Sequence, residues 1–109
     1  MIFIVVKFQV NPEDCYRWMD TVTPFTKATR AEPGNKWFEW YHSFDAPNEF
    51  VLVEAFADDA AAAHVNSAHF AAGLDAMRPL LAETPKIISQ TIAADDWSEM
   101  AELRIGDED

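Results

Sequence analysis

Residues 36–56, KWFEWYHSFDAPNEFVLVEAF, decide the fold of this chain. Two runs rich in aromatic and β-branched side chains, 36–44 and 49–56, stand on either side of the segment Asp45-Ala46-Pro47-Asn48. Runs of this kind around a short Asp- and Pro-containing loop are typical of a β-hairpin. We therefore expect two antiparallel strands joined by a four-residue loop.

The segments before the hairpin have the patterns of one strand and one helix. Residues 2–10 alternate, as in a strand that buries one of its faces. Residues 11–31 then carry apolar side chains at helical spacing, with Pro12 suited to the first helical position. Pro24 lies inside this helix and lacks a backbone donor, so we expect a kink or a break there.

The segments after the hairpin predict two helices and a last strand. An alanine-rich helix begins at Asp58 or Asp59 and ends at about residue 65, and a second helix runs from 66 or 67 to about 81. Residues 86–92 form the fourth strand. The order β-α-β-β-α-β predicts an α+β, ferredoxin-like fold, in which an antiparallel sheet carries both helices on one face.

The chain divides into a domain and an acidic tail. Residues 1–94 contain all the elements above, which we expect to form one ferredoxin-like domain. Residues 95–109 hold seven acidic residues and one arginine. Within this tail, Asp96 and Glu99 form a capping-box pattern that predicts a short helix with Trp97, Met100 and Leu103.

Charge and composition exclude several classes of partner. The chain has 109 residues and a net charge of −11, so it would repel the phosphates of nucleic acids and anionic lipid surfaces. No stretch has the length needed to span a bilayer. A single cysteine cannot form an internal disulfide, and no export signal is recognised, so we expect a cytoplasmic protein.

The predicted loop length fixes which hairpin residues oppose each other. One face is mostly apolar, with the pairs His42–Val51, Trp40–Val53 and Phe38–Ala55. The other face mixes aromatic and acidic side chains, with the pairs Ser43–Phe50, Tyr41–Leu52, Glu39–Glu54 and Trp37–Phe56. We expect the helices on the apolar face, which leaves the mixed face open.

The open face predicts a homodimer. Its side chains would expose a larger apolar patch than monomers usually carry: Trp37, Tyr41, Leu52 and Phe56. A second copy packed on this face would bury the patch and enclose a cavity lined by aromatic, carboxylate and amide groups. We expect a small-molecule site in that cavity.

Residues 32–70, EPGNKWFEWYHSFDAPNEFVLVEAFADDAAAAHVNSAHF, carry five short motifs in order. They are a Glu-Pro-Gly turn, the aromatic-Glu step Phe38-Glu39, Asp-x-Pro in the loop, Val-Leu-x-Glu-x-aromatic over 51–56, and His-x-x-Ser-x-His-Phe over 64–70. This layout resembles the antibiotic biosynthesis monooxygenase domain family, which includes quinol monooxygenases. With the flanking elements, the resemblance covers about residues 1–94.

The resemblance implies a dimeric α/β barrel built from two ferredoxin-like units. For some members it implies oxygenation of phenolic or quinol substrates with O₂, without metal or flavin. Other members have no assigned activity, and others resemble heme-degrading enzymes whose first strand carries an Asn. Here the polar residues of that strand are Lys7 and Gln9, which disfavours heme degradation.

Oxygenation without a cofactor requires the substrate to supply the electrons. The protein must favour a phenolate or quinolate, exclude water and leave apolar space for O₂. Candidate oxyanion donors are the Asn35 amide and the Trp37 indole N–H. The candidate bases are Glu39, Glu54, His64 and His69. The side chains expected to contact the substrate also include Tyr41, Leu52, Phe56 and Phe70.

Structural roles compete with these chemical ones. Glu39 and Glu54 either form a carboxylate pair in which one pKa is raised, or each bonds an Arg or Lys within the sheet. Trp37 and Tyr41 either line the substrate site or pack in a dimer interface, since aromatic side chains are common in both.

Metal binding is not expected from the histidine spacing. His64 and His69 lie five residues apart, which places them about 140° apart around one continuous helix. Two ligands in that arrangement are poorly placed to share a metal ion. A helix-capping role or a place at the pocket edge suits them better.

The sequence therefore predicts a homodimeric, cofactor-independent monooxygenase that oxidises a phenolic or quinol-type small aromatic substrate with O₂. The alternative is a non-catalytic dimer of the same fold whose cavity binds a small molecule. Heme binding and degradation is the third reading.

Overall fold

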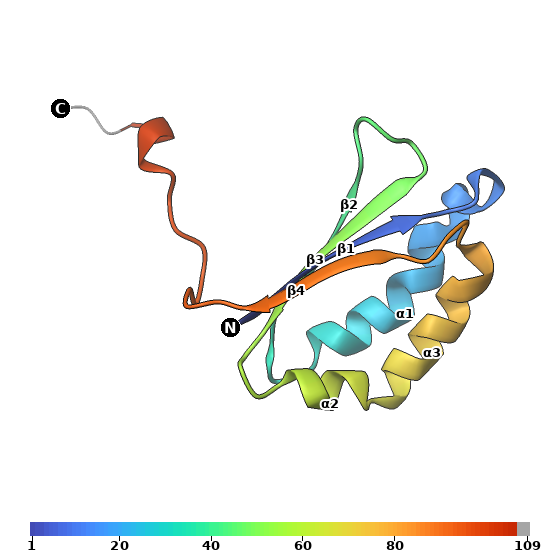
Figure 1. The fold of residues 1–109 in the computed structure, drawn as a ribbon, viewed down its shortest axis with the longest axis horizontal. Coiled ribbons are helices and arrows are strands. Elements are labelled where there is room, and N and C mark those ends of the chain that lie inside the picture. The colour runs from blue at the N-terminus through green and yellow to red at the C-terminus, as the bar shows by residue number, and fades with distance from the viewer. Residues whose placement is uncertain (107–109) are drawn as a thin grey trace.

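Four antiparallel strands form one sheet in the order β2-β3-β1-β4, and the α-helices cover one of its faces (Figure 1). A computed structural model describes residues 1–106. The strands are β1 (Ile2–Gln9), β2 (Asn35–His42), β3 (Glu49–Phe56) and β4 (Lys86–Thr91). The helices are η1 (Pro12–Arg17), α1 (Trp18–Arg30), α2 (Ala61–Val65), α3 (Ala68–Met77), η2 (Arg78–Leu80) and η3 (Ala101–Leu103), where η marks a 3₁₀-helix. The predicted α+β, ferredoxin-like arrangement is confirmed.

The hydrophobic core lies between the sheet and helices α1 and α3. Trp18 at the start of α1 is fully buried, and its ring packs against Phe8 of β1 and Phe50 of β3 with centroid distances of 5.3 and 5.9 Å. Further along α1, the ring of Phe25 packs edge to face against the ring of Phe38 in β2, with a centroid distance of 5.3 Å. These aromatic contacts fix α1 across the sheet.

Helix α1 continues through Pro24, so the break expected there does not occur. The chain instead enters α1 through the 3₁₀-helix η1, which begins at Pro12. Pro24 has no N–H to donate to the carbonyl of Asp20, four residues earlier. Both residues lie on the exposed side of the helix. Water can therefore satisfy that carbonyl, and the helix tolerates the proline.

The hairpin register differs by one residue from the prediction. The observed pairs are Trp37–Ala55, Phe38–Glu54, Glu39–Val53, Trp40–Leu52, Tyr41–Val51 and His42–Phe50. Ser43 explains the shift, because its N–H donates to the Glu49 carbonyl at 3.0 Å and its Oγ accepts the Ala46 N–H at 3.0 Å. These bonds leave residues 44–48 in the loop, one residue more than predicted.

A one-residue slip turns a strand over, so β3 presents the opposite faces to those expected. The side chains beneath the helices are Phe50, Leu52, Glu54 and Phe56, while Val51, Val53 and Ala55 lie on the open face. Strand β2 is placed as predicted, with Phe38 and Trp40 toward the helices. The predicted Glu39–Glu54 carboxylate pair is therefore wrong, because the two side chains lie on opposite faces of the sheet.

Residues 95–106 form an extended arm in which the helix predicted from Asp96 is absent (Figure 1). Asp96 Oδ1 accepts the N–H of its neighbour Trp97 at 2.7 Å, and the one helical turn of the arm is η3. The predicted tail also includes residues 107–109, which lie outside the described residues. Among the helices of residues 1–106, none has the length and apolar character to cross a bilayer.

Candidate active site

A cavity of about 210 Å³, which we call the inner cavity, lies between the helices and the sheet. Two titratable side chains line it, Glu54 from β3 and His64 from α2. The remaining lining residues are apolar: Val6, Phe8, Phe25, Leu52, Phe70, Leu74, Met77, Pro85 and Ile87. Small-molecule sites commonly combine an apolar wall with a few polar groups in this way.

Glu54 places a carboxyl group against the apolar wall of the inner cavity. Its residue is only 6% exposed, and its sheet neighbours are Ile4 on β1 and Phe38 on β2. Burial, together with the negative charge of Glu32, raises the pKa of Glu54 from 4.5 to about 7. A carboxyl group with this pKa can accept and return a proton near neutral pH.

His64 is joined to His69 through the carboxylate of Glu32. One oxygen, Glu32 Oε2, lies 2.8 Å from His64 Nδ1 and 2.5 Å from His69 Nε2. Each imidazole can donate an N–H to this oxygen. The His64 ring is further held by Phe56 and Phe70, whose centroids lie 4.7 and 5.1 Å away. The Glu32–His64–His69 cluster therefore fixes the ring that lines the inner cavity.

A break between two helices brings the histidines together. Helix α2 ends at Val65 and α3 begins at Ala68, so His64 and His69 do not share one helix. Ser67 makes this junction, because its Oγ accepts the Phe70 N–H at 3.1 Å and donates to the His64 carbonyl at 2.7 Å.

Glu32 reaches the histidines from the turn between α1 and β2. The Glu32 N–H donates to the Thr29 carbonyl at 3.0 Å, and Gly34 accepts the Ala57 N–H at 2.9 Å. A Cβ atom placed on Gly34 would lie 2.2 Å from the Ala60 Cβ, just before α2. Only glycine therefore allows the turn to approach α2 this closely.

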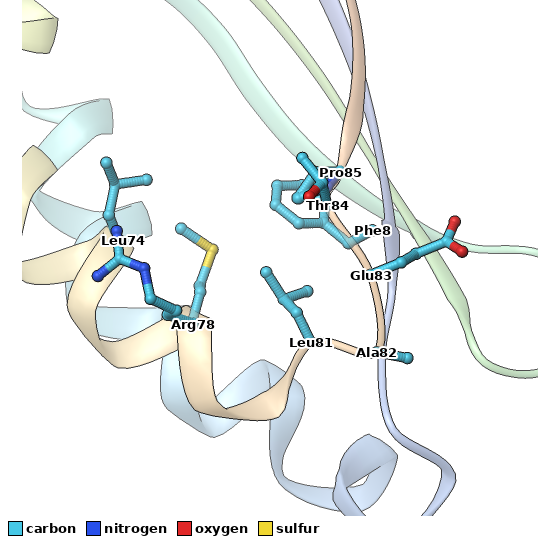
Figure 2. A pocket seen from close by; sticks show the side chains of 9 residues that line it. Phe8, Leu74, Arg78, Leu81, Ala82, Glu83, Thr84 and Pro85 are labelled. Carbon is cyan, nitrogen blue, oxygen red and sulfur yellow. The ribbon is translucent and has the colours of Figure 1, made fainter.

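A second pocket of about 480 Å³, the outer pocket, adjoins the inner cavity. Figure 2 shows Leu74 and Arg78 on one side, Phe8 and Pro85 on the other, and Leu81 between them. The two spaces share four lining residues: Phe8, Leu74, Met77 and Pro85. The outer pocket, with a polar guanidinium among its walls, therefore lies next to the apolar space that holds Glu54.

Three predicted site residues lie on the opposite face of the sheet. Tyr41 donates its hydroxyl to Glu39 Oε1 at 3.1 Å, and this hydrogen bond raises the pKa of Tyr41. Trp37 packs between Phe3 of β1 and Trp97 of the arm, with centroid distances of 6.5 and 5.2 Å. None of these residues lines the inner cavity.

Asn35 spans a β-bulge at the start of β2. The register shifts between Asn35 and Trp37, so Lys36 is the extra residue. The Asn35 amide donates to the Trp37 carbonyl at 3.0 Å and to the Ala55 carbonyl at 3.3 Å. Both amide hydrogens are therefore used by the backbone.

The structure divides the predicted site residues into two groups. Glu54, His64, Leu52 and Phe70 line the inner cavity, with Phe56 and His69 directly behind His64. On the open face or at its bulge lie Glu39, Trp37, Tyr41 and Asn35. Sequence reasoning assigned no role to Glu32 or Phe25. The one signal for Glu32 was its place in the Glu-Pro-Gly turn.

Comparison with known proteins gives one family. A family model described as antibiotic biosynthesis monooxygenase matches residues 1–76. The chain is similar in structure to a candidate antibiotic biosynthesis monooxygenase from Nitrosomonas europaea, with a TM-score of 0.78 and 27% identity, over 86% of this chain and 100% of that one. Among curated proteins, no relative is matched.

Two further solved structures share the fold. Rv0793 from Mycobacterium tuberculosis has a TM-score of 0.77 and 22% identity, over 89% of this chain and 98% of that one. A conserved protein from Methanosarcina mazei Go1 has a TM-score of 0.77 and 22% identity, over 82% and 89%. The match to the family model covers well over half of the sequence. This chain therefore belongs to the antibiotic biosynthesis monooxygenase family.

Proposed function

We propose that this protein is a monooxygenase that binds a phenolic or quinol-type aromatic substrate in the inner cavity and oxidises it with O₂. The observation that carries the proposal is the buried carboxyl group of Glu54 in a cavity whose other lining residues, apart from His64, are apolar. The family to which the chain belongs, and the name of its Nitrosomonas europaea neighbour, support monooxygenase chemistry.

Glu54 acts as the general base in this proposal. It takes the proton of the substrate hydroxyl, and the resulting phenolate is electron-rich enough to react with O₂. One oxygen atom of O₂ is added to a ring carbon, as a new carbonyl on a phenol or as a hydroxyl on a quinol, and the other leaves as water. The substrate, which becomes a quinone, supplies all the electrons, so the reaction as proposed needs no cofactor.

The surrounding residues define the substrate that fits. Apolar walls from Phe25, Phe70 and Met77 suit a flat aromatic ring, and they exclude water from the phenolate. The outer pocket offers room for a larger substituent beside Arg78. We therefore propose a substrate with one hydroxylated ring in the inner cavity and a second ring or side chain in the outer pocket.

A homodimer formed by the open faces completes the proposal. Exposed apolar side chains support it, since Tyr41 and Ile88 on the open face are 53% and 69% exposed. The arm adds four more that are at least 64% exposed: Trp97, Met100, Leu103 and Ile105. A second copy would cover both sets, as monomers rarely leave such surfaces in water.

Oxygen uptake tests the proposed activity. Metal-stripped, flavin-free protein is mixed with a panel of hydroquinones, naphthols and anthrones, and uptake is compared with autoxidation in buffer alone. With ¹⁸O₂, one labelled atom is expected in the quinone product. Glu54→Gln is expected to lower kcat by about 100-fold or more. Glu49→Gln, at the other end of β3 and outside both pockets, is the matched control.

The results separate the enzyme from a binding protein. No turnover above autoxidation across the panel would refute the oxygenase. Thermal stabilisation by these compounds without turnover would instead favour a non-catalytic small-molecule-binding protein. Full activity in Glu54→Gln would remove Glu54 as the base.

A further inference from the structure

Glu32, His64 and His69 come from three separate segments and bring three potential ligand atoms together. Glu32 Oε2, His64 Nδ1 and His69 Nε2 all lie within 4.8 Å of one another. We infer that these side chains form a binding site for one divalent first-row transition-metal ion of the Zn²⁺ type. This inference goes beyond the proposed oxidation and does not depend on it.

The ligand types match this class of ion. Two imidazole nitrogens and one carboxylate oxygen form a donor set that binds Zn²⁺ and other first-row divalent ions, with a further position open for water. Ca²⁺ and Mg²⁺ prefer oxygen ligands, so they suit this set poorly. The histidines bind the metal in their neutral form.

Binding an ion requires the donor atoms to rearrange from their hydrogen-bonded positions. Ligand bonds of 2.0–2.1 Å in a tetrahedral site place the donor atoms about 3.3 Å apart. The two observed separations from Glu32 Oε2 are 2.8 and 2.5 Å, which are hydrogen-bond distances. Replacing these two hydrogen bonds by one ion therefore needs each nitrogen to move away from Glu32 Oε2 by about 0.5–0.8 Å. The two histidine nitrogens, which lie within 4.8 Å of each other, must also approach to about 3.3 Å.

Two ligands are held rigidly and the third lies nearer to solvent. The side chains of His64 and Glu32 are 6% and 14% exposed, so packing fixes their positions before any ion binds. The His69 side chain is 28% exposed and lies in the first turn of α3, where it can shift and admit an ion. This combination gives a site with two preformed ligands and a third that can move to admit the ion.

Charge also favours a cation here. With neutral histidines the cluster carries only the negative charge of Glu32, and the chain as a whole has a net charge of −11. A divalent ion would join the turn after α1 to α2 and α3. Because the ion binds the folded arrangement of these three segments, binding is expected to stabilise the folded protein.

Zinc titration tests the site directly. Metal-stripped wild-type protein competes with a chromophoric chelator for Zn²⁺, and one equivalent is expected to bind. His69→Gln and Glu32→Gln are each expected to weaken binding by at least about tenfold. His42→Gln removes a histidine that stacks on Phe50 at the far end of the hairpin, and this matched control should bind Zn²⁺ like wild type.

Cobalt provides a second measurement. Co²⁺ bound to the wild-type protein is expected to show d–d absorption bands that are lost in His69→Gln. The melting temperature should rise with Zn²⁺ in the wild type and in His42→Gln but not in His69→Gln. Circular dichroism of each variant confirms that it is folded, and His69 is the preferred position because it is the most exposed ligand.

Defined results would overturn the inference. One is that the wild-type protein does not bind one equivalent of Zn²⁺. The other is that His69→Gln and Glu32→Gln both bind Zn²⁺ as tightly as wild type. An equal loss in His42→Gln would indicate adventitious binding at surface histidines. The oxidation assay uses metal-stripped protein and Glu54→Gln, so a failure of that function and a failure of this site are read separately.

Discussion

Replacing Glu54 by Gln should make the protein more stable at alkaline pH, and the gain should disappear in acid. Gln has nearly the shape of protonated Glu but never ionises. The pKa of Glu54 is raised from 4.5 to about 7 by burial and by Glu32, so the folded protein holds this proton more tightly than the unfolded chain. Ionisation of Glu54 therefore costs folding free energy as pH rises from about 4.5 to 7.

The size of the effect follows from the two pKa values. The difference between about 7 and 4.5, at about 1.4 kcal/mol per pH unit, gives about 3 kcal/mol above pH 7. Glu54→Gln should thus gain nothing relative to wild type near pH 4.5 and about 3 kcal/mol near pH 8. Differences between Glu and Gln that do not involve ionisation change the free energy of unfolding by the same amount at every pH. The test is therefore the pH dependence of the difference between Glu54→Gln and wild type.

Urea unfolding at fixed protein concentration, repeated at several values between pH 4.5 and 9, measures this difference. At pH 8 the midpoint should rise by roughly 1–3 M urea. Glu83→Gln is the matched control, because Glu83 is exposed and its replacement should change stability by less than about 0.5 kcal/mol at any pH. A pH-independent difference for Glu54→Gln, or a gain that grows toward acid, would refute the reasoning.

Three further substitutions test the packing, the helix junction and the open face. Gly73→Ala should cost about 1–2 kcal/mol in urea unfolding, because its Cβ would lie 2.7 Å from the Phe25 ring and this clash outweighs the better helix propensity of Ala. Ser67→Ala should cost about 1 kcal/mol, since it removes the acceptor for the Phe70 N–H at the start of α3. Val53→Asp places a charge on the open face and should convert the proposed dimer to a monomer in sedimentation experiments.

Each substitution has a control. The cost of Gly73→Ala should shrink in a Phe25→Leu background, and an undiminished cost would contradict the ring clash. Ser67→Asp keeps a capping oxygen and should retain stability, whereas a loss equal to that of Ser67→Ala would exclude the cap as the cause. Ala72→Asp puts the same charge on the exposed side of α3 and should leave the oligomeric state unchanged. A monomeric wild type would refute the dimer itself.

The sequence predicted the architecture because the strand and helix patterns are strong and local. The alternation over β1, the aromatic runs of β2 and β3 and the helical spacing of α1 each predicted an element that the structure contains. The order of these elements was then enough to predict the antiparallel sheet and the placement of both helices on one side of it.

The faces of β3 were not predictable from the same information. They depend on one hydrogen-bonded residue, Ser43, which adds a residue to the loop and turns the next strand over. The consequence for the site is large, because Glu54 lines the inner cavity instead of pairing with Glu39 as predicted. The alternation pattern of β3 could not reveal this, since both of its faces carry apolar side chains.

The histidine cluster was missed for a related reason. The spacing of His64 and His69 excluded a shared ligand only if one helix carried both. The sequence itself predicted a helix break at residues 65–67, which the capping bond at Ser67 confirms, so the one-helix spacing did not apply. Glu32, which completes the cluster, lies more than thirty positions earlier in the chain. Contacts between such distant segments are set by tertiary packing, which local sequence patterns do not contain.

Because Gly34 approaches Ala60 so closely, a substitution at position 34 affects the active site more than it affects the fold. A methyl group at position 34 would push the turn off the adjoining helix, yet the aromatic contacts that hold α1 to the sheet lie elsewhere. A variant with that change could keep a native circular dichroism spectrum while its carboxylate and imidazoles drift apart. Screens that score only expression or solubility would pass it as neutral.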